Sequence, residues 1–305
     1  MLDIKIFDVD HGFCAAINAG NQHQILIDCG YNSQTRFHPT GYLLNNSTHH
    51  LNYLIIPTFA QGCLAGFYDL MGHSRKHCLT IDYLMANPSI DLENLPALIV
   101  QNFGKSNSFK FLSDVFKRCS NVERTVHQGN IEVSFFWNTY PEFLDFHNLS
   151  LVTFVSYKDI NIIFPGNLKT EGWRTLLRNS KFRDRLQQVN LFVASNHGQE
   201  DGYCPEVFNY CHPDLIIISN ESHRLVPASI MQQYERHARG IETTWGQQKV
   251  LTTHEAGTIS IKQHPDNSLQ VITQQCKVYP TLRQHKCSLE LRATTYFSKL
   301  AGVAP

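Results

Sequence analysis

The chain has 305 residues, with 26 basic and 26 acidic side chains and a formal net charge of zero. That balance excludes a protein that binds nucleic acid through a bulk basic surface, and it excludes an acidic solvating tail. Charged residues make up 17% of the chain and hydrophobic residues 42%, whereas an average soluble protein has about 25% charged residues. A weakly charged surface favours association, so we expect protein partner subunits, or a second copy of this chain, to cover part of it.

The sequence predicts neither a membrane span nor a signal peptide. No run of about 18 apolar residues is present. Asp3 and Lys5 interrupt the apolar N-terminal residues, which indicates a strand. The nine cysteines are widely spaced and include no Cys-x-x-Cys pair. Reduced thiols are the simplest interpretation, and they favour a cytoplasmic protein.

Strand-like and helix-like segments alternate along the chain, and strands are in the majority. Strands are predicted over 4–7, 15–18, 24–28, 53–56, 82–86, 97–101, 132–137, 149–156, 161–164, 191–194, 215–219, 258–261 and 269–273. Helices are predicted over 64–71, 110–118, 172–178, 182–187 and 227–239. This pattern suits an α+β fold in which two packed sheets are flanked by helices. Because no Gly/Ser/Pro-rich linker interrupts the pattern, residues 1–275 are interpreted as one domain. Residues 276–305 form a C-terminal extension, either an appended strand and helix or a docking segment.

Polar or glycine-containing motifs follow several of the predicted strands. They are DVDHG (8–12), LIDCG (26–30), PTFAQGCLAG (57–66), PGN (165–167), SNHG (195–198) and TTHEAGTI (252–259). Their order and spacing resemble the metallo-β-lactamase fold, and within it the hydrolase domain of the ComEC competence family. That family carries D-V-G-x-G-D, L-I-D-x-G, S/T-H-x-H-x-D-H-x-x-G, N-x-x-S, T-G-D, H-H-G and T-x-x-x-G-x-I. The resemblance implies an αββα sandwich over residues 1–275, with its active site on loops at one sheet edge.

The chain departs from the family where the family binds metal. The residues at the family's ligand positions are Thr58, Ala60, Gly62, Cys63, Asn167, Asn196 and His197. Asp28 is retained, but the resemblance implies a largely structural role for it. A zinc site needs three or four well-placed ligands. Cys63 and His197 remain, with Asp28 and His11 as further candidates, so we expect no bound zinc and no other cofactor.

The leading hypothesis is a catalytically inactive pseudoenzyme that acts as an interaction subunit of a multi-protein complex. The resemblance to this family suggests a bacterial source and a role in defence or DNA handling. One alternative is a metal-dependent hydrolase, a phosphodiesterase or nuclease, with a rebuilt site that uses His197, Cys63 and Asn167, with Asp28 or His11. A second alternative is a pocket for a nucleotide or another anion, in which Asn196, His197 and Thr58 supply hydrogen bonds.

Cys63 has two interpretations. As a thiolate with His197 beside it, Cys63 would be a nucleophile. As a thiol, it would be a small buried residue that fills the space of the lost metal, and this interpretation is favoured.

Other candidate groups have structural interpretations that we favour. The pairs His49/His50 and His73/His77 are interpreted as polar loop histidines rather than metal ligands. The acids Asp8, Asp10 and Asp28 would bind Mg²⁺ only if they converged, and more often such residues accept turn hydrogen bonds. The basic residues between 105 and 124 are interpreted as a solvated helix face, and the aromatic residues between 135 and 146 as core.

Overall fold

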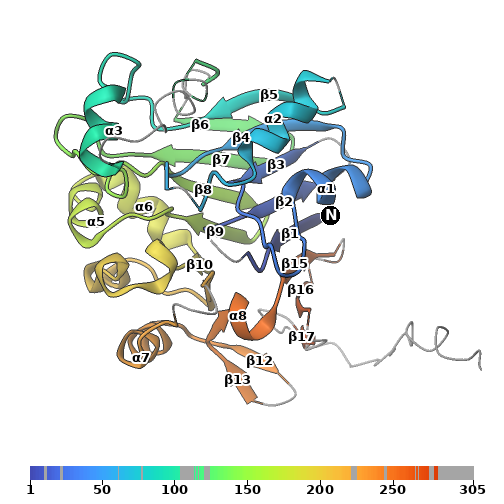
Figure 1. Ribbon diagram of the computed structural model, residues 1–305. Helices are drawn as coiled ribbons and strands as arrows, with labels where there is room; N and C mark the ends of the chain where they lie inside the picture. Colours follow the sequence, from blue (N-terminus) through green and yellow to red (C-terminus); the bar gives the residue numbers. More distant parts are fainter. Residues whose placement is uncertain are drawn as a thin grey trace, which may run out of the picture.

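The computed structural model describes residues 1–9, 12–20, 23–60, 62–76, 78–103, 113, 115, 117–119, 124–220, 225–243, 246–264, 266, 268–274 and 278–280. Over these residues the chain forms an αββα sandwich of the metallo-β-lactamase type, as predicted. Two large sheets pack face to face, and helices cover the outer face of each sheet (Figure 1).

The first sheet has the strand order β17-β16-β15-β1-β2-β3-β4-β5, and the second has the order β14-β11-β10-β9-β8-β7-β6. The first sheet contains β1 (Leu2–Ile6), β2 (Ala15–Ala19), β3 (Gln24–Ile27), β4 (His50–Ile55), β5 (Thr80–Met85), β15 (Ile259–Gln263), β16 (Leu269–Thr273) and β17 (Val278–Pro280). The second contains β6 (Thr125–Gln128), β7 (Ile131–Phe136), β8 (Val152–Tyr157), β9 (Ile160–Phe164), β10 (Leu191–Val193), β11 (Leu215–Ile218) and β14 (Val250–Thr252). A small separate ribbon pairs β12 (Ile241–Thr243) with β13 (Gly246–Gln248).

Helices lie on both outer faces. They are α1 (Pro39–Asn45), α2 (Phe67–Arg75), α3 (Leu95–Phe103), α5 (Thr170–Leu176), α6 (Ser180–Gln188), α7 (Ala228–His237) and α8 (Thr253–Ala256). Three short 3-10 turns follow β10, namely η1 (Ser195–Gly198), η2 (Glu200–Gly202) and η3 (Pro205–Asn209). Figure 1 shows α1 and α2 beside the first sheet and α5 and α6 beside the second.

Three apolar clusters hold the layers together. The cluster between the sheets receives alternate residues of each strand, such as Leu2, Ile4 and Ile6 of β1, because successive side chains of a strand point to opposite faces. A second cluster lies between the first sheet and α1, α2 and α3, and a third between the second sheet and α5, α6 and α7. Trp173 and Phe182 anchor the third cluster, with ring centroids 6.1 Å apart.

Parallel strands bring several loops to one edge of the sandwich. In the first sheet Ile27 of β3 pairs with Ile55 of β4, and in the second Val193 of β10 pairs with Ile217 of β11. The carboxyl ends of parallel strands meet at the same edge of a sheet. Leu151 N also donates to Pro57 O at 2.8 Å and so joins the two sheets at this edge. The motifs after β3, β4, β9 and β10 therefore meet there.

The predicted strand over 97–101 is wrong, because these residues belong to α3. The signal that indicates a helix precedes the apolar run. Asp91 Oδ1 accepts hydrogen bonds from the backbone N–H groups of Glu93 and Asn94 at 3.0 and 2.8 Å, as a capping acid does. Leu95, Leu98 and Ile99 are then buried together at helical spacing.

The remaining predicted elements agree with the structure to within a few residues, with one exception. The helix expected over 110–118 falls mostly outside the described residues. Several further elements are not predicted from the sequence, because they are short segments with weak periodicity. They are α1, α8, β6, β14, the β12–β13 ribbon and the three 3-10 turns. The described part of the chain contains no helix that is long and apolar enough to cross a membrane. The seven described cysteines are all free thiols.

Candidate functional site

A small cavity lies where the strand-end loops of the two sheets meet. Asp28, Asn167, His197 and Ser219 line it together with apolar residues, among them Phe13. About 20 Å³ of it is open to the centre of a water molecule, which is room for about one water. Three of the predicted cleft residues therefore share this cavity, but it is too small for an organic substrate.

Asp28 is buried directly after β3, and its two carboxyl oxygens lack nitrogen or oxygen donors among the described residues. Its backbone has a φ of 59°, and its N–H donates to Ile55 O at 2.8 Å. Neither carboxyl oxygen accepts a hydrogen bond from a nitrogen or oxygen of the described residues. Burial raises the pKa of the Asp28 carboxyl well above its ordinary value, and a hydrogen bond with the Cys63 thiol lowers that pKa only in part. The folded protein therefore favours a neutral carboxyl group here.

Cys63 is fully buried beside Asp28. Its carbonyl accepts from Cys29 N at 2.8 Å, which ties the loop after β4 to the loop after β3. Burial, and secondly the negative charge of an ionised Asp28, raise the pKa of the Cys63 thiol well above its ordinary value. Metal ligation and nucleophilic attack both need the thiolate. The surroundings of Cys63 thus support its interpretation as a small buried residue.

Neither Cys63 nor the other three residues singled out in the segment after β4 line the cavity. Thr58 is buried, and its Oγ1 donates a long hydrogen bond of 3.5 Å to Phe146 O. Ala60 is half-buried and packs against the cluster between the sheets. A Cβ atom on Gly12 would lie 2.3 Å from the carbonyl carbon of Gly62. Gly12 therefore lies directly against the backbone of Gly62.

Asn196 and His197 adopt left-handed backbone conformations, with φ of 46° and 57°. Such values are uncommon for residues with a side chain and often mark functional loops. Asn196 Nδ2 donates to Asp201 Oδ1 at 2.6 Å, and His197 Nδ1 lies 3.1 Å from Ser219 O. The structure therefore holds Asn196 toward Asp201 and His197 toward the loop after β11.

The donor set does not fit zinc. Among the described residues, no group of three His, Cys, Asp or Glu side chains is arranged to hold a metal ion. Asp10 and His11 lie outside the described residues.

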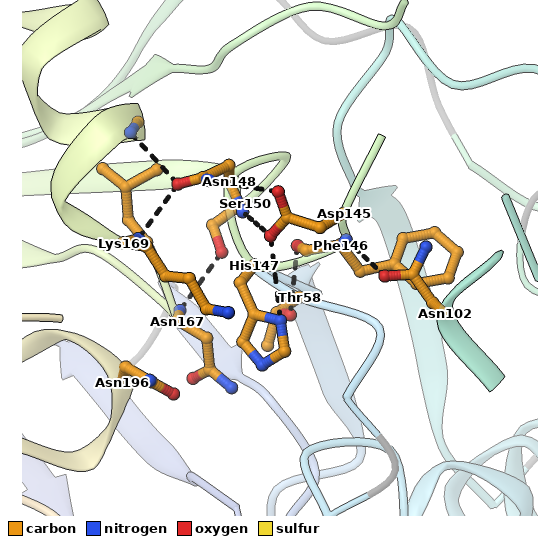
Figure 2. A network of polar contacts seen from close by, with 12 residues as sticks. Thr58, Asn102, Asp145, Phe146, His147, Asn148, Ser150, Asn167, Lys169 and Asn196 are labelled. Atoms are coloured by element: carbon orange, nitrogen blue, oxygen red, sulfur yellow. Dashed lines mark hydrogen bonds and ion pairs between the residues drawn. The ribbon is translucent and has the colours of Figure 1, made fainter. Parts of the chain in front are cut away.

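A network of polar contacts that is not predicted from the sequence supports the loops around Asn167 (Figure 2). The side-chain Oδ1 of Asn148 accepts from Lys169 N and Gly172 N, both at 3.1 Å. Ser150 Oγ accepts from Asn167 N, also at 3.1 Å. The sequence draws attention to this segment only through its aromatic residues, and its polar residues carry no motif that would single them out.

The same network presents His147 and Lys169 at the rim of the site. His147 Nδ1 lies 3.8 Å from Asp145 Oδ1, and Lys169 Nζ lies 3.5 Å from Asp201 Oδ2. Figure 2 shows the side chains of His147, Asn167 and Lys169 on the same side of the loops. The side chains of a histidine and a lysine therefore stand beside Asn167.

The other described histidine candidates make contacts away from the cavity. His50 Nε2 lies 2.8 Å from Asp82 Oδ2, and His49 Nδ1 lies 3.1 Å from Cys78 O. His73 Nδ1 lies 3.0 Å from the carbonyl of Asp69, one helical turn earlier. His77 lies outside the described residues.

The remaining candidate groups also make structural contacts. The backbone carbonyl of Asp8 accepts a hydrogen bond from Asn32 Nδ2 at 3.3 Å. Arg124 lies over the ring of Trp137 at 4.4 Å. The aromatic residues Phe135, Phe136 and Phe146 are buried in the core. The rest of the basic stretch falls largely outside the described residues.

No family model and no curated protein matches the sequence. Solved structures do match the fold. A diphosphatase from the PhnP family has a TM-score of 0.48 and 7% identity, covering 87% of this chain and 98% of that chain. A metallo hydrolase from Ignicoccus hospitalis has a TM-score of 0.47 and 10% identity, covering 85% and 99%. A Cronobacter sakazakii metallo-β-lactamase with a HARLDQ motif has a TM-score of 0.38 and 16% identity, covering 63% and 74%. The likeness is one of fold, so function is argued from this chain's own residues.

Proposed function

We propose that the chain is a metal-independent pseudoenzyme that acts as an interaction subunit of a multi-protein complex. The observation that carries the proposal is the buried pair of Asp28 and Cys63. Both groups favour the neutral, protonated form, and together they occupy the loop edge where a catalytic member of the fold would hold a charged metal centre. A neutral pair stabilises this edge of the sandwich without a metal.

The size of the cavity supports the same proposal. A cavity open over about 20 Å³ admits a water molecule but not a scissile bond with its flanking groups. Catalysis needs a substrate atom within reach of the reacting groups. Substrate access to Asp28, which is 1% exposed, would require the loops at this edge to separate.

Exposed apolar side chains support a role in protein association. Tyr68 of α2 is 58% exposed, Tyr83 of β5 46% and Val100 of α3 58%. Exposed apolar residues mark a partner surface where they form one contiguous patch. Together with the low content of charged residues, they favour a chain that works in a complex.

Metal analysis of protein purified without a chelator tests the proposal. We expect substoichiometric zinc, manganese and iron, together with defined partner subunits that co-purify with the native protein. Stoichiometric metal that His197→Ala removes would contradict the proposal.

One observation favours a rebuilt hydrolase as a second candidate. His197 lines the cavity beside Asp28 and Asn167 and has a left-handed backbone, and such strain is concentrated at active sites. Hydrolysis of bis(p-nitrophenyl) phosphate or single-stranded DNA, lost in His197→Ala, would support this candidate. Equal background rates in the wild type and in His197→Ala would exclude it.

A further inference from the structure

A cluster of polar side chains lies on the rim of the site, outside the small cavity. It consists of His147, Asn167, Lys169, Asn196 and Asp201, and we call it the rim cluster. Its members come from three separate loops, and backbone contacts such as Asn196 N to Gly166 O at 3.1 Å hold these loops together. Figure 2 shows four of the five side chains gathered on one side of the polar network.

We propose that the rim cluster binds a phosphoryl oxyanion, and that Asp201 takes the place of this ligand in the free protein. The two carboxylate oxygens of Asp201 have different donors. Oδ1 accepts from Asn196 Nδ2 at 2.6 Å, and Oδ2 lies 3.5 Å from Lys169 Nζ. An amide and an ammonium group thus already hold an oxyanion of this chain, and both kinds of donor also bind phosphate.

The carboxylate of Asp201 can leave without a change in the fold. Its side chain is 52% exposed, and that of Lys169 is 35% exposed, so the ion pair between them adds little stability. The backbone of Asp201 is held separately, because Thr170 Oγ1 donates to its carbonyl at 3.0 Å. Rotation of one side chain would therefore expose the donors to an external anion.

Two further groups favour a phosphoryl ligand over a carboxylate. Asn167 is only 4% exposed, and its side-chain amide makes no hydrogen bond with the described residues. His147 presents its imidazole from a third loop, with Nδ1 toward Asp145. Donors on three loops match the three outer oxygens of a phosphate monoester better than the two oxygens of a carboxylate. The site needs no metal and does not depend on the proposed function.

Binding of inorganic phosphate and of adenosine 5′-monophosphate to the full chain tests the proposal, by calorimetry and by thermal shift. Both compounds should bind and raise the unfolding temperature, since a ligand of the folded state stabilises it. Adenosine, which lacks the oxyanion, should do neither. If phosphate alone binds, the ligand is the free ion. If adenosine monophosphate binds more tightly, it is the nucleotide. If neither binds at millimolar concentration, the proposal is overturned.

Variants assign the binding to the rim cluster. Lys169→Ala should weaken phosphate binding about tenfold, as expected for the loss of one charged donor. Lys169→Met, which keeps the aliphatic stem, should do the same, whereas exposed Lys181→Ala should bind as the wild type does. Asp201→Asn should strengthen binding about threefold, because a competing negative charge several ångströms away is removed. Unchanged binding in both Lys169 variants, or weaker binding in a folded Asp201→Asn variant, would overturn the proposal.

Discussion

Cys63 and Asp28 are buried side by side, with exposed fractions of 0% and 1%. The two residues come from the loops after β4 and β3, at the edge where the parallel strands end. An ionised carboxylate there would accept no hydrogen bond from a nitrogen or oxygen of the described residues, and the neighbouring thiol is a weak donor. The pair is therefore stable as two neutral groups, and this neutrality has consequences that can be measured.

Asp28→Asn should change how stability depends on pH. The pKa of Asp28 is raised in the folded state, whereas the unfolded chain has the ordinary value near 3.8. Between these two values the folded state retains a proton that the unfolded state releases, so the wild type loses stability as the pH rises. The amide that replaces the carboxyl group does not titrate. Relative to the wild type, the free energy of unfolding of the variant should rise by about 1.4 kcal/mol per pH unit across this window. Above the window, the difference between the two proteins should stay constant. Urea unfolding between pH 4 and pH 8 measures the difference.

Asp266→Asn is the matched control, because the shift there has the opposite sign. Hydrogen bonds from Ser268 lower the pKa of the exposed Asp266 carboxyl. Its contribution to the free energy of unfolding is complete above the ordinary pKa of 3.8 and is lost only as the pH falls below that value. Between pH 4 and pH 8 this variant should therefore differ from the wild type by a constant amount. A pH-independent effect of Asp28→Asn would show that Asp28 is ionised in the folded protein.

The thiols should separate into two classes toward an alkylating reagent. Cys78 is exposed, whereas Cys14, Cys29 and Cys63 are fully buried with pKa values raised by burial. Reaction requires an accessible thiolate. Mass spectrometry after brief treatment with iodoacetamide should find Cys78 modified and the three buried thiols intact until urea is added. Cys78→Ser should remove that rapid modification. Rapid modification of Cys63 in the native protein would instead support the nucleophile interpretation.

The order of the strand-end motifs is enough to predict the sandwich and the meeting of Asp28, Asn167 and His197 at one edge. Each of these residues follows a strand closely, and the pairing of parallel strands determines where strands end. Lys169 and His147 could not be placed in the same way. Their positions depend on Asn148, which contacts the backbone of residues more than twenty positions away, and such contacts have no local pattern. The helix at 95–103 is not predicted, because its apolar run outweighs the capping signal of Asp91.

Gly12→Ala should be far more destabilising than Gly20→Ala. Both glycines have positive φ, 89° and 75°, so alanine at either position incurs backbone strain of about 1 kcal/mol. A Cβ on Gly12 would also lie 2.3 Å from the Gly62 backbone, whereas a Cβ on Gly20 would meet nothing within 4 Å. The steric conflict at Gly12 should add about 1–3 kcal/mol. Urea unfolding of the two variants separates the steric effect from the conformational one. Equal losses would mean that the two loops do not close on each other.

Asn148→Ala should lower the free energy of unfolding by about 2–4 kcal/mol. The substitution removes the acceptor of two backbone N–H groups, those of Lys169 and Gly172, and each unsatisfied buried donor costs about 1–3 kcal/mol. It also releases the loop that carries Lys169 and Asn167, so phosphate binding should weaken along with stability. Asn46→Ala is a suitable control, because the exposed Asn46 side chain donates only to Tyr42 O within its own helix turn. A loss of stability in Asn148→Ala with unchanged phosphate affinity would show that the network supports the fold but does not position the rim cluster.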